Sequence, residues 1–365
     1  MSLETLINTL GEGETATIAG LLVGLGFGAL AQRSRFCLRA AAIEFWRGSI
    51  GPKVAIWLLA FGAAVAGTQL FIYFDLLDVA EARQLANPGS LSGAIIGGAM
   101  FGVGMILSRG CASRLLVLSA TGNLRALMTG LILTLFAQAS LNGGLSPLRE
   151  ALAGLWMVDG GPSRDLIAQL GLNSDWALAF GLICVAAALL FALRSKVSGW
   201  VMIGAAGVGG MIAVGWFTTY AIASLSFSPE SVKSISFIGP SADTLMAFVN
   251  QPSLPLGFDL GMVPGVFVGS FLAALLARDL KLECFSMDMK PMPRYLAGAG
   301  LMGFGGMLAG GCAVGAGVTG GAVFALTAWV ALTSMWVAAG ITDYLVDLRR
   351  ERAEQASIRT LAPAE

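Results

Sequence analysis

The chain has 365 residues, of which 56% are hydrophobic and only 12% are charged. A soluble domain carries about 25% charged residues, so this composition excludes an ordinary soluble protein and favours a polytopic membrane protein. The formal net charge is zero, which gives no reason to expect nucleic-acid binding, and the chain has no histidine. Because histidine is the usual general base and the commonest metal ligand, we expect no catalytic residue, no metal site and no cofactor.

The apolar segments predict an all-α protein with about nine transmembrane helices. The 49 glycines fit this prediction, because small residues let membrane helices approach closely. The whole chain is expected to form a single transmembrane domain, residues 1–365. The predicted spans are 16–32, 54–74, 92–108, 124–143, 176–194, 199–220, 256–277, 294–310 and 321–345.

The charges predict the orientation. Basic residues cluster after the first span and again at Arg349 and Arg350, whereas residues 75–81 and 159–175 lean acidic. The positive-inside rule then places the N-terminus in the periplasm and residues 346–365 in a cytoplasmic tail. Two segments rich in proline and glycine, 144–175 and 221–255, are predicted as long loops on the outer face.

One glycine and cysteine pattern occurs twice. Gly-x-Gly, five further residues and Gly-Cys-Ala lead to Cys111 and again, 201 positions later, to Cys312. A weaker match at an offset of 181 relates the surroundings of Cys37 to those of Thr218. The alternative to a duplication is that glycine-rich membrane helices have similar sequences by chance. We favour the duplication because the pattern around the two cysteines is long.

The duplication predicts how the domain is organised. Residues 16–143 form repeat one, 176–194 form a linker helix, and 199–345 form repeat two. The odd linker span inverts the second repeat relative to the first, in a 4+1+4 arrangement. Inverted repeats of this kind place a binding site near the bilayer midplane, between broken helices.

The glycine before each duplicated cysteine predicts a break in the span. Gly110-Cys111 and Gly311-Cys312 each follow an apolar half-span and are poor continuous helix. A broken or re-entrant half-helix exposes backbone N–H groups, which attract anions. The alternative is that glycine permits close packing and cysteine is a small buried hydrophobe. Two related copies favour a site.

Arginines surround two of these thiols. Arg33, Arg35 and Arg39 flank Cys37, and Arg109 and Arg114 flank Cys111. They either concentrate an anion at the cytoplasmic mouth or anchor the spans at the membrane surface. The two remaining cysteines lack these features: Cys184 is expected to pack in a span and Cys284 to lie in a surface loop.

The chain resembles the YeeE/YedE family of sulfur-compound transporters. The resemblance rests on Arg33-Ser34-Arg35-Phe36-Cys37, Arg109-Gly110-Cys111, Gly215-Trp216-Phe217-Thr218 and Gly310-Gly311-Cys312-Ala313-Val314-Gly315. It implies a bacterial inner-membrane protein that imports thiosulfate or a related sulfur species, with selenium compounds associated with some members. It further implies that Cys37, Cys111 and Cys312 line the path, and that a cytoplasmic sulfur carrier of the YeeD/TusA type is the partner.

These observations give a hypothesis of transport without covalent chemistry. Thiol groups are weak donors toward a soft sulfur atom, and broken helices offer N–H groups to an oxyanion. The expected path comprises Cys37, Cys111, Cys312, Gly110, Gly311, Thr218, Arg109 and Arg35. Two alternatives stay open. A membrane thiol oxidoreductase would need a paired CxxC, which the sequence lacks, and a non-transporting anchor for a sulfurtransferase would leave the paired broken spans unexplained.

Overall fold

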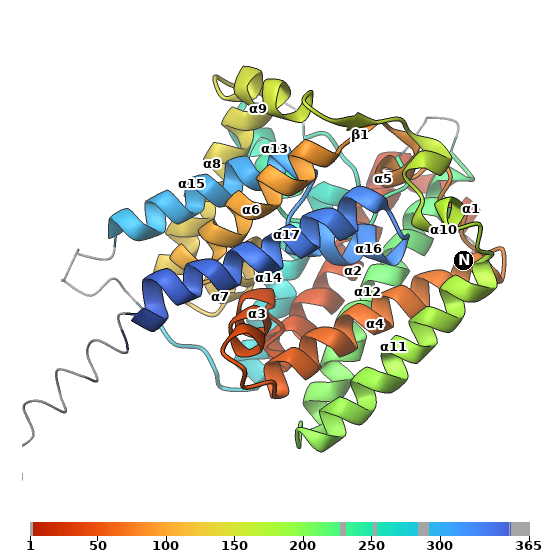
Figure 1. The fold of residues 1–365 in the computed structure, drawn as a ribbon. Coiled ribbons are helices and arrows are strands. Elements are labelled where there is room, and N and C mark those ends of the chain that lie inside the picture. Colours follow the sequence, from red (N-terminus) through yellow and green to blue (C-terminus); the bar gives the residue numbers. More distant parts are fainter. Residues whose placement is uncertain (1–2, 227–230, 251–253, 284–291, 350, 352–365) are drawn as a thin grey trace, which may run out of the picture.

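The computed structural model describes residues 3–226, 231–250, 254–283, 292–349 and 351. In this part of the chain, nine helical segments are long and apolar enough to cross a bilayer, which confirms the predicted fold class. They lie side by side in one bundle (Figure 1). The long helices are α2 (Glu12–Ser34), α4 (Pro52–Tyr73), α6 (Leu91–Leu107), α8 (Leu124–Asn142), α11 (Ser174–Arg194), α12 (Gly199–Ala223), α14 (Phe258–Leu276), α15 (Met292–Leu308) and α17 (Leu326–Thr342).

Short elements connect or continue these helices. Two two-residue strands, β1 (Gly89–Ser90) and β2 (Met157–Val158), pair antiparallel at one end of the bundle. The short helices are α1 (Leu3–Leu10), α3 (Leu38–Trp46), α5 (Arg83–Ala86), α7 (Ala112–Ala120), α9 (Ser146–Ala153), α10 (Leu166–Gln169), α13 (Ile238–Asn250) and α16 (Gly320–Ala322), with a 3-10 turn η1 (Gly161–Ser163) and π-helical segments η2 (Ala313–Thr319) and η3 (Asp343–Leu348).

Glycines set the distance between the most closely packed helices. A Cβ atom on Gly20, Gly24 or Gly28 of α2 would lie 2.0, 2.3 or 2.2 Å from a carbonyl oxygen of α14. Every fourth residue of α2 therefore presents bare backbone to its neighbour. This is the small-residue packing typical of membrane helices, where close approach replaces the hydrophobic effect as the source of attraction.

The helix contacts occur in matching pairs. Helix α2 packs on α14, and α12 packs on α4; likewise α6 packs on α17, and α15 packs on α8. Individual contacts match as well. Gly102 of α6 lies against the carbonyl oxygen of Met335, and Gly303 of α15 lies against that of Leu133. In both pairs, a glycine near the middle of one helix lies against the backbone of its neighbour.

The predicted loop 221–255 contains a helix, which corrects the sequence analysis. Helix α13 occupies Ile238–Asn250, and its Ile238 and Ala242 are fully buried. Pro240 is one of the prolines on which the predicted loop rests, and it stands in the first turn of α13. Proline is tolerated there, because the first N–H groups of a helix have no partner within the helix.

The predicted loop 144–175 is folded onto the bundle around Arg164. Only 7% of this side chain is exposed. Its guanidinium donates to the carbonyl oxygen of Asn87 at 2.5 Å and to the hydroxyl of Thr327 at 2.6 Å. Burial lowers the pKa of Arg164 from its ordinary value. The loop is therefore fixed to the first turn of α17 rather than free on the surface.

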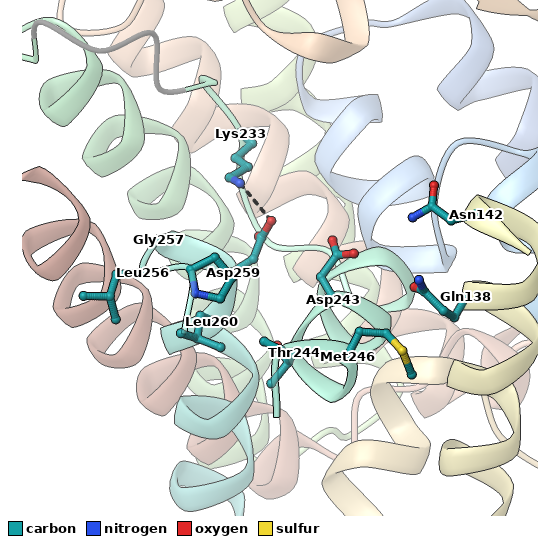
Figure 2. A pocket seen from close by; sticks show the side chains of 12 residues that line it. Gln138, Asn142, Lys233, Asp243, Thr244, Met246, Leu256, Gly257, Asp259 and Leu260 are labelled. Atoms are coloured by element: carbon teal, nitrogen blue, oxygen red, sulfur yellow. Dashed lines mark hydrogen bonds and ion pairs between the residues drawn. The ribbon is translucent and has the colours of Figure 1, made fainter. Parts of the chain in front are cut away.

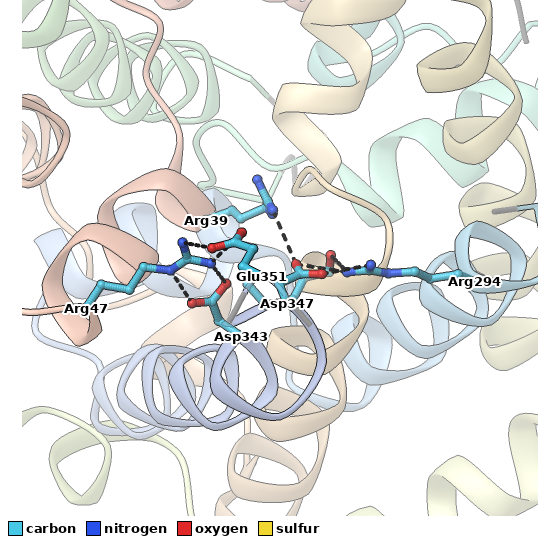
Figure 3. Close-up of polar contacts among 7 residues, drawn as sticks. Arg39, Arg47, Arg294, Asp343, Asp347 and Glu351 are labelled. Atoms are coloured by element: carbon cyan, nitrogen blue, oxygen red, sulfur yellow. Dashed lines mark hydrogen bonds and ion pairs between the residues drawn. The ribbon is translucent and has the colours of Figure 1, made fainter. Parts of the chain in front are cut away.

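A network of arginines and carboxylates closes the opposite end of the bundle (Figure 3). Arg47 donates to the buried Asp343 at 2.7 Å, and this bond raises the pKa of Arg47. Asp347 pairs with Arg294 at 2.8 Å and lies 3.9 Å from Arg39. These bonds fix the end of α17 and η3 to α3 and α15. The N-terminal and C-terminal ends of the described chain lie at opposite ends of the bundle (Figure 1).

Candidate functional site

Three cysteines occupy the same kind of position. Cys37, Cys111 and Cys312 are each the residue immediately before a helical segment, namely α3, α7 and η2. All three interrupt a candidate membrane span, because the spans cover Glu12–Trp46, Leu91–Ala120 and Met292–Ala322. Each thiol therefore lies where the backbone changes direction and the first N–H groups of the next helix are free of the preceding one.

The breaks before the cysteines have a common local cause. The residue two positions before each cysteine has a left-handed backbone: φ is 54° at Arg35, 57° at Arg109 and 82° at Gly310. This conformation ends a helix because it directs the chain away from the helix axis. Only Gly310 adopts it without strain from a Cβ atom, so the two arginines are unusual at this place.

The same hydrogen bonds end α6 and α15. The N–H of Gly110 donates to the carbonyl of Met105 at 3.2 Å, and the N–H of Gly311 donates to that of Gly306 at 2.8 Å. Both bonds span five residues, as in the Schellman motif that closes many helices. The glycine–cysteine pattern is thus a helix stop followed directly by a helix start.

The structure brings two of the predicted thiols together. The side chains of Cys37 and Cys111 are neighbours, and Arg39 and Arg114 act electrostatically on Cys37. The Sγ of Cys111 also lies 3.3 Å from the hydroxyl of Ser113. Cys111 is almost fully buried, and both cysteines are free thiols rather than a disulfide. Together they form a compact group of weak donors with positive charge beside it.

The third thiol lies against a different helix start. Cys312 is 1% exposed, and its Sγ accepts the N–H of Gly315 at 3.3 Å. The N–H groups of Phe237 and Ile238 also contact this sulfur. Because Ile238 begins α13, Cys312 stands where the first turns of α13 and η2 converge. Two helix N-termini thus offer N–H groups at one buried point.

Residues 231–237 reach this point as an irregular segment in which Val232, Ser234, Ile235 and Phe237 are buried. Thr319 donates to the carbonyl of Ile235 at 2.7 Å, and Ser234 donates to the carbonyl of Ile212 at 2.6 Å. Irregular backbone at membrane depth needs partners of this kind because lipid offers none. The sequence analysis missed the segment, although Ile235, Phe237 and Ile238 form an apolar group that could have indicated burial.

The other predicted residues have different surroundings. Gly110 and Gly311 are buried beside their cysteines, whereas the side chains of Arg35 and Arg109 are exposed, so these arginines contribute to the breaks through their backbone. Thr218 lies within α12, and its hydroxyl donates to the carbonyl of Val214 in the same helix. Cys184 is half-buried on α11, and Cys284 lies outside the described residues.

The thiols are suited to holding a soft anion without bonding to it. In the part of the chain that the structure describes, no group of three or more cysteine, aspartate or glutamate side chains could hold a metal ion. The groups around each thiol are a second thiol or backbone N–H groups, and arginine side chains lie near Cys37. These are donors and positive charges, which recognise an anion.

The fold and the thiols together define a class of protein, namely a multi-pass membrane protein in which interrupted spans carry buried cysteines. The family model described as sulphur transport matches residues 33–341, and the chain belongs to this family. Membership confirms that the chain is a transporter and not an enzyme. It also confirms the resemblance stated from the cysteine motifs.

Two curated relatives match over nearly their whole length. The chain is 28% identical over 333 residues to the thiosulfate transporter TsuA of Spirochaeta thermophila, covering 86% of this chain and 93% of that protein. It is 26% identical over 364 residues to the thiosulfate transporter TsuA of Escherichia coli K12, covering 92% and 96%. A shorter match, 32% over 111 residues, relates 30% of this chain to 26% of the probable transporter YedE of Salmonella typhimurium.

Proposed function

We propose that this protein imports thiosulfate, or a closely related sulfur anion, across the bacterial inner membrane along a path lined by Cys37, Cys111 and Cys312. The observation that carries the proposal is the shared position of these thiols, each buried or half-buried at a helix start that interrupts a membrane span. The relatives named as thiosulfate transporters support the substrate, since they match over most of the chain.

The chemistry of the thiols fits the two ends of thiosulfate. The terminal sulfur is soft and accepts weak S–H donors, which Cys37 and Cys111 supply as a pair. The charged sulfonate end is served by the backbone N–H groups where α13 and η2 begin beside Cys312. Several weak sites in series release an ion faster than one tight site, which transport requires.

Inverted repeats would explain the matching contacts of the two halves. Elements α6, α7 and α8 correspond to α15, η2 and α17, with nearly constant spacing along the chain, and α11 is the linker between the halves. On this alignment α3, which begins at Leu38, corresponds to α13, which begins at Ile238. The counterpart of Cys37 is then Phe237 or Ile238 rather than Thr218. In one half Cys37 lies beside Cys111 at the start of α7, and in the other half Phe237 and Ile238 at the start of α13 lie beside Cys312.

The orientation follows from the charges at the two ends of the bundle. Arg39, Arg47 and Arg294 lie at the end that carries the C-terminal part of the chain (Figure 3). The positive-inside rule makes this end cytoplasmic, with the N-terminus in the periplasm. A cytoplasmic sulfur carrier of the YeeD/TusA type would meet the transporter there and take up the imported sulfur.

Uptake of radiolabelled thiosulfate into proteoliposomes tests the proposal against its alternatives. We expect time-dependent accumulation that empty liposomes lack and that unlabelled thiosulfate inhibits. A thiol oxidoreductase would consume thiosulfate or a thiol without moving label into the lumen. A non-transporting anchor would bind a sulfurtransferase and leave the label outside, and either outcome would rule out the proposal.

A further inference from the structure

A cavity of about 680 Å³ lies between α8, α13, α14 and the segment before α13 (Figure 2). It is not lined by the three path cysteines. Its charged lining residues are Lys233, Asp243 and Asp259, and its polar neutral ones are Gln138, Asn142 and Thr244. The cavity therefore offers mostly oxygen atoms, and its chemistry differs from that of the thiols.

Helix α13 connects this cavity to the thiol of Cys312. The N–H of Ile238 contacts the Sγ of Cys312, and Asp243 lies five residues further along the same helix. At about 1.5 Å of rise per residue, the two points are within about 8 Å along the helix axis. An ion bound at Asp243 would thus act on the helix whose first turn contacts the proposed anion path.

The cavity lies toward the end of the bundle that holds the N-terminus. Gly257, one of its lining residues, donates to the hydroxyl of Thr17 at 2.8 Å, close to the start of α2. This end is the periplasmic one in the proposed orientation. An external ion would therefore meet the cavity from outside, on the side where import begins.

The charges in the cavity leave one carboxylate without a counter-ion. Lys233 pairs with Asp259 at 2.8 Å, whereas Asp243, whose side chain is solvent-exposed at the cavity, makes no hydrogen bond or ion pair with the residues that the structure describes. The charged groups that act on Asp243 are Asp259, Lys233 and Arg83 of α5. Burial, and after it the charge of Asp259, raises the pKa of Asp243 from its ordinary value.

Two further oxygen atoms in the lining have no partner. Thr244 is 8% exposed, and its hydroxyl oxygen makes no hydrogen bond within the described chain. The side-chain carbonyl oxygen of Gln138 is also buried and unpaired there. Buried polar atoms left unpaired cost about 1–3 kcal/mol each, so a missing partner is expected. In a cavity that is also lined by the carboxylate of Asp243, a cation is the partner that such oxygens accept, because hard cations prefer oxygen ligands.

We propose that this cavity binds a monovalent cation, a proton or Na⁺, at Asp243 with help from Thr244 and Gln138, and that the cation is transported together with the sulfur anion. The inference rests on the proposed function. An inside-negative membrane potential opposes import of a doubly charged anion. Cations that move with the anion reduce or reverse the net charge carried inward, so this site would couple uptake to an ion gradient.

Proteoliposomes with imposed gradients test the proposal. Uptake of labelled thiosulfate is measured with an inward proton gradient, with an inward Na⁺ gradient, and with neither, while K⁺ and valinomycin hold the potential constant. We expect one gradient to raise the initial rate severalfold; the proton arm and the Na⁺ arm identify the ion. Asp243→Asn should abolish this stimulation but keep exchange of internal for external thiosulfate, which needs no gradient.

Matched variants separate coupling from folding. Asp175→Asn changes an exposed carboxylate at the start of α11, and it should keep the stimulation. Thr244→Val keeps the side-chain volume and should weaken the stimulation, which keeps the test valid if Asp243→Asn does not fold. Wild-type uptake that ignores both gradients, or full stimulation in Asp243→Asn, would overturn the cation site while leaving thiosulfate transport intact. Absence of all wild-type uptake and exchange would instead reject the proposed function and this site with it.

Discussion

Gly97 of α6 lies against the backbone of Gly305 in α15, so closely that a Cβ atom on Gly97 would be 2.5 Å from the carbonyl oxygen of Gly305. The reverse contact occurs at the same crossing, where a Cβ atom on Gly305 would be 2.7 Å from the carbonyl oxygen of Gly97. Helices α6 and α15 lead directly to Cys111 and Cys312. Their crossing therefore fixes the two breaks relative to each other.

This crossing should not accept a side chain. Gly97→Leu forces two backbones apart, so we expect little folded protein and a clearly lower melting temperature in any that forms. Gly210→Ala is the matched control, because a Cβ atom there meets no atom within 4 Å. Alanine gains up to about 1 kcal/mol over glycine in a helix, so this control should be neutral or stabilising. Size-exclusion profiles and thermal unfolding in detergent measure both; equal behaviour of the two variants would contradict the close crossing.

The carboxylate of Asp343 should stabilise the end of the bundle at which α17 and η3 end. Arg47 bonds both Asp343, whose side chain is 2% exposed, and Glu351, whose side chain is 51% exposed. Removing the buried partner leaves Arg47 without its main counter-charge, and we expect Asp343→Asn to cost about 3 kcal/mol. Glu351→Gln should cost less than about 1 kcal/mol because water screens an exposed pair. Thermal unfolding of the two variants tests this order, and a larger loss in Glu351→Gln would refute it.

The sequence was sufficient to predict the fold class and where two spans break. Apolar length and glycine content predict the nine spans, and the paired pattern around Cys111 and Cys312 locates two helix stops, because glycine and cysteine there act through local backbone geometry. The left-handed Arg35 and Arg109 were not predictable, since arginine is unfavourable in that conformation and nothing local announces it.

Local sequence patterns could not predict which residues surround the thiols. Helix α13 was not predicted, because Pro240 indicates a loop unless it is known to stand in the first turn of a helix. The contact between Cys312 and Ile238 joins residues far apart in the chain, and tertiary packing alone creates it. A short local match in the sequence pairs Cys37 with Thr218, whereas the repeat alignment proposed above, based on the helix starts, pairs Cys37 with Phe237 or Ile238.

Thr218 distinguishes the two alignments of the repeats. Its hydroxyl is already bonded to the carbonyl of Val214 within α12, so it has no free donor to offer an anion. Thr218→Val keeps the shape of the side chain, and we expect uptake close to wild type at matched expression. A severalfold loss of uptake with normal folding would restore Thr218 to the path and favour the alignment at an offset of 181.

Single cysteine variants should divide into two groups. Cys111→Ala and Cys312→Ala each remove one weak donor; a hydrogen bond of about 1 kcal/mol corresponds to roughly a fivefold loss of uptake rate. Cys184→Ala is the matched control, because Cys184 is half-buried on α11, away from the breaks. Initial uptake rates at equal amounts of folded protein test this division. Equal losses in all three would indicate a general packing effect.

The central claim is that the thiols themselves guide the sulfur anion. The triple variant Cys37→Ala/Cys111→Ala/Cys312→Ala removes all three while changing little volume, and its folded yield and melting temperature should stay near those of the wild type. Labelled thiosulfate uptake into proteoliposomes measures the consequence most directly. We predict that this folded variant takes up no more label than empty liposomes, whereas uptake at the wild-type rate would contradict the thiol-lined path.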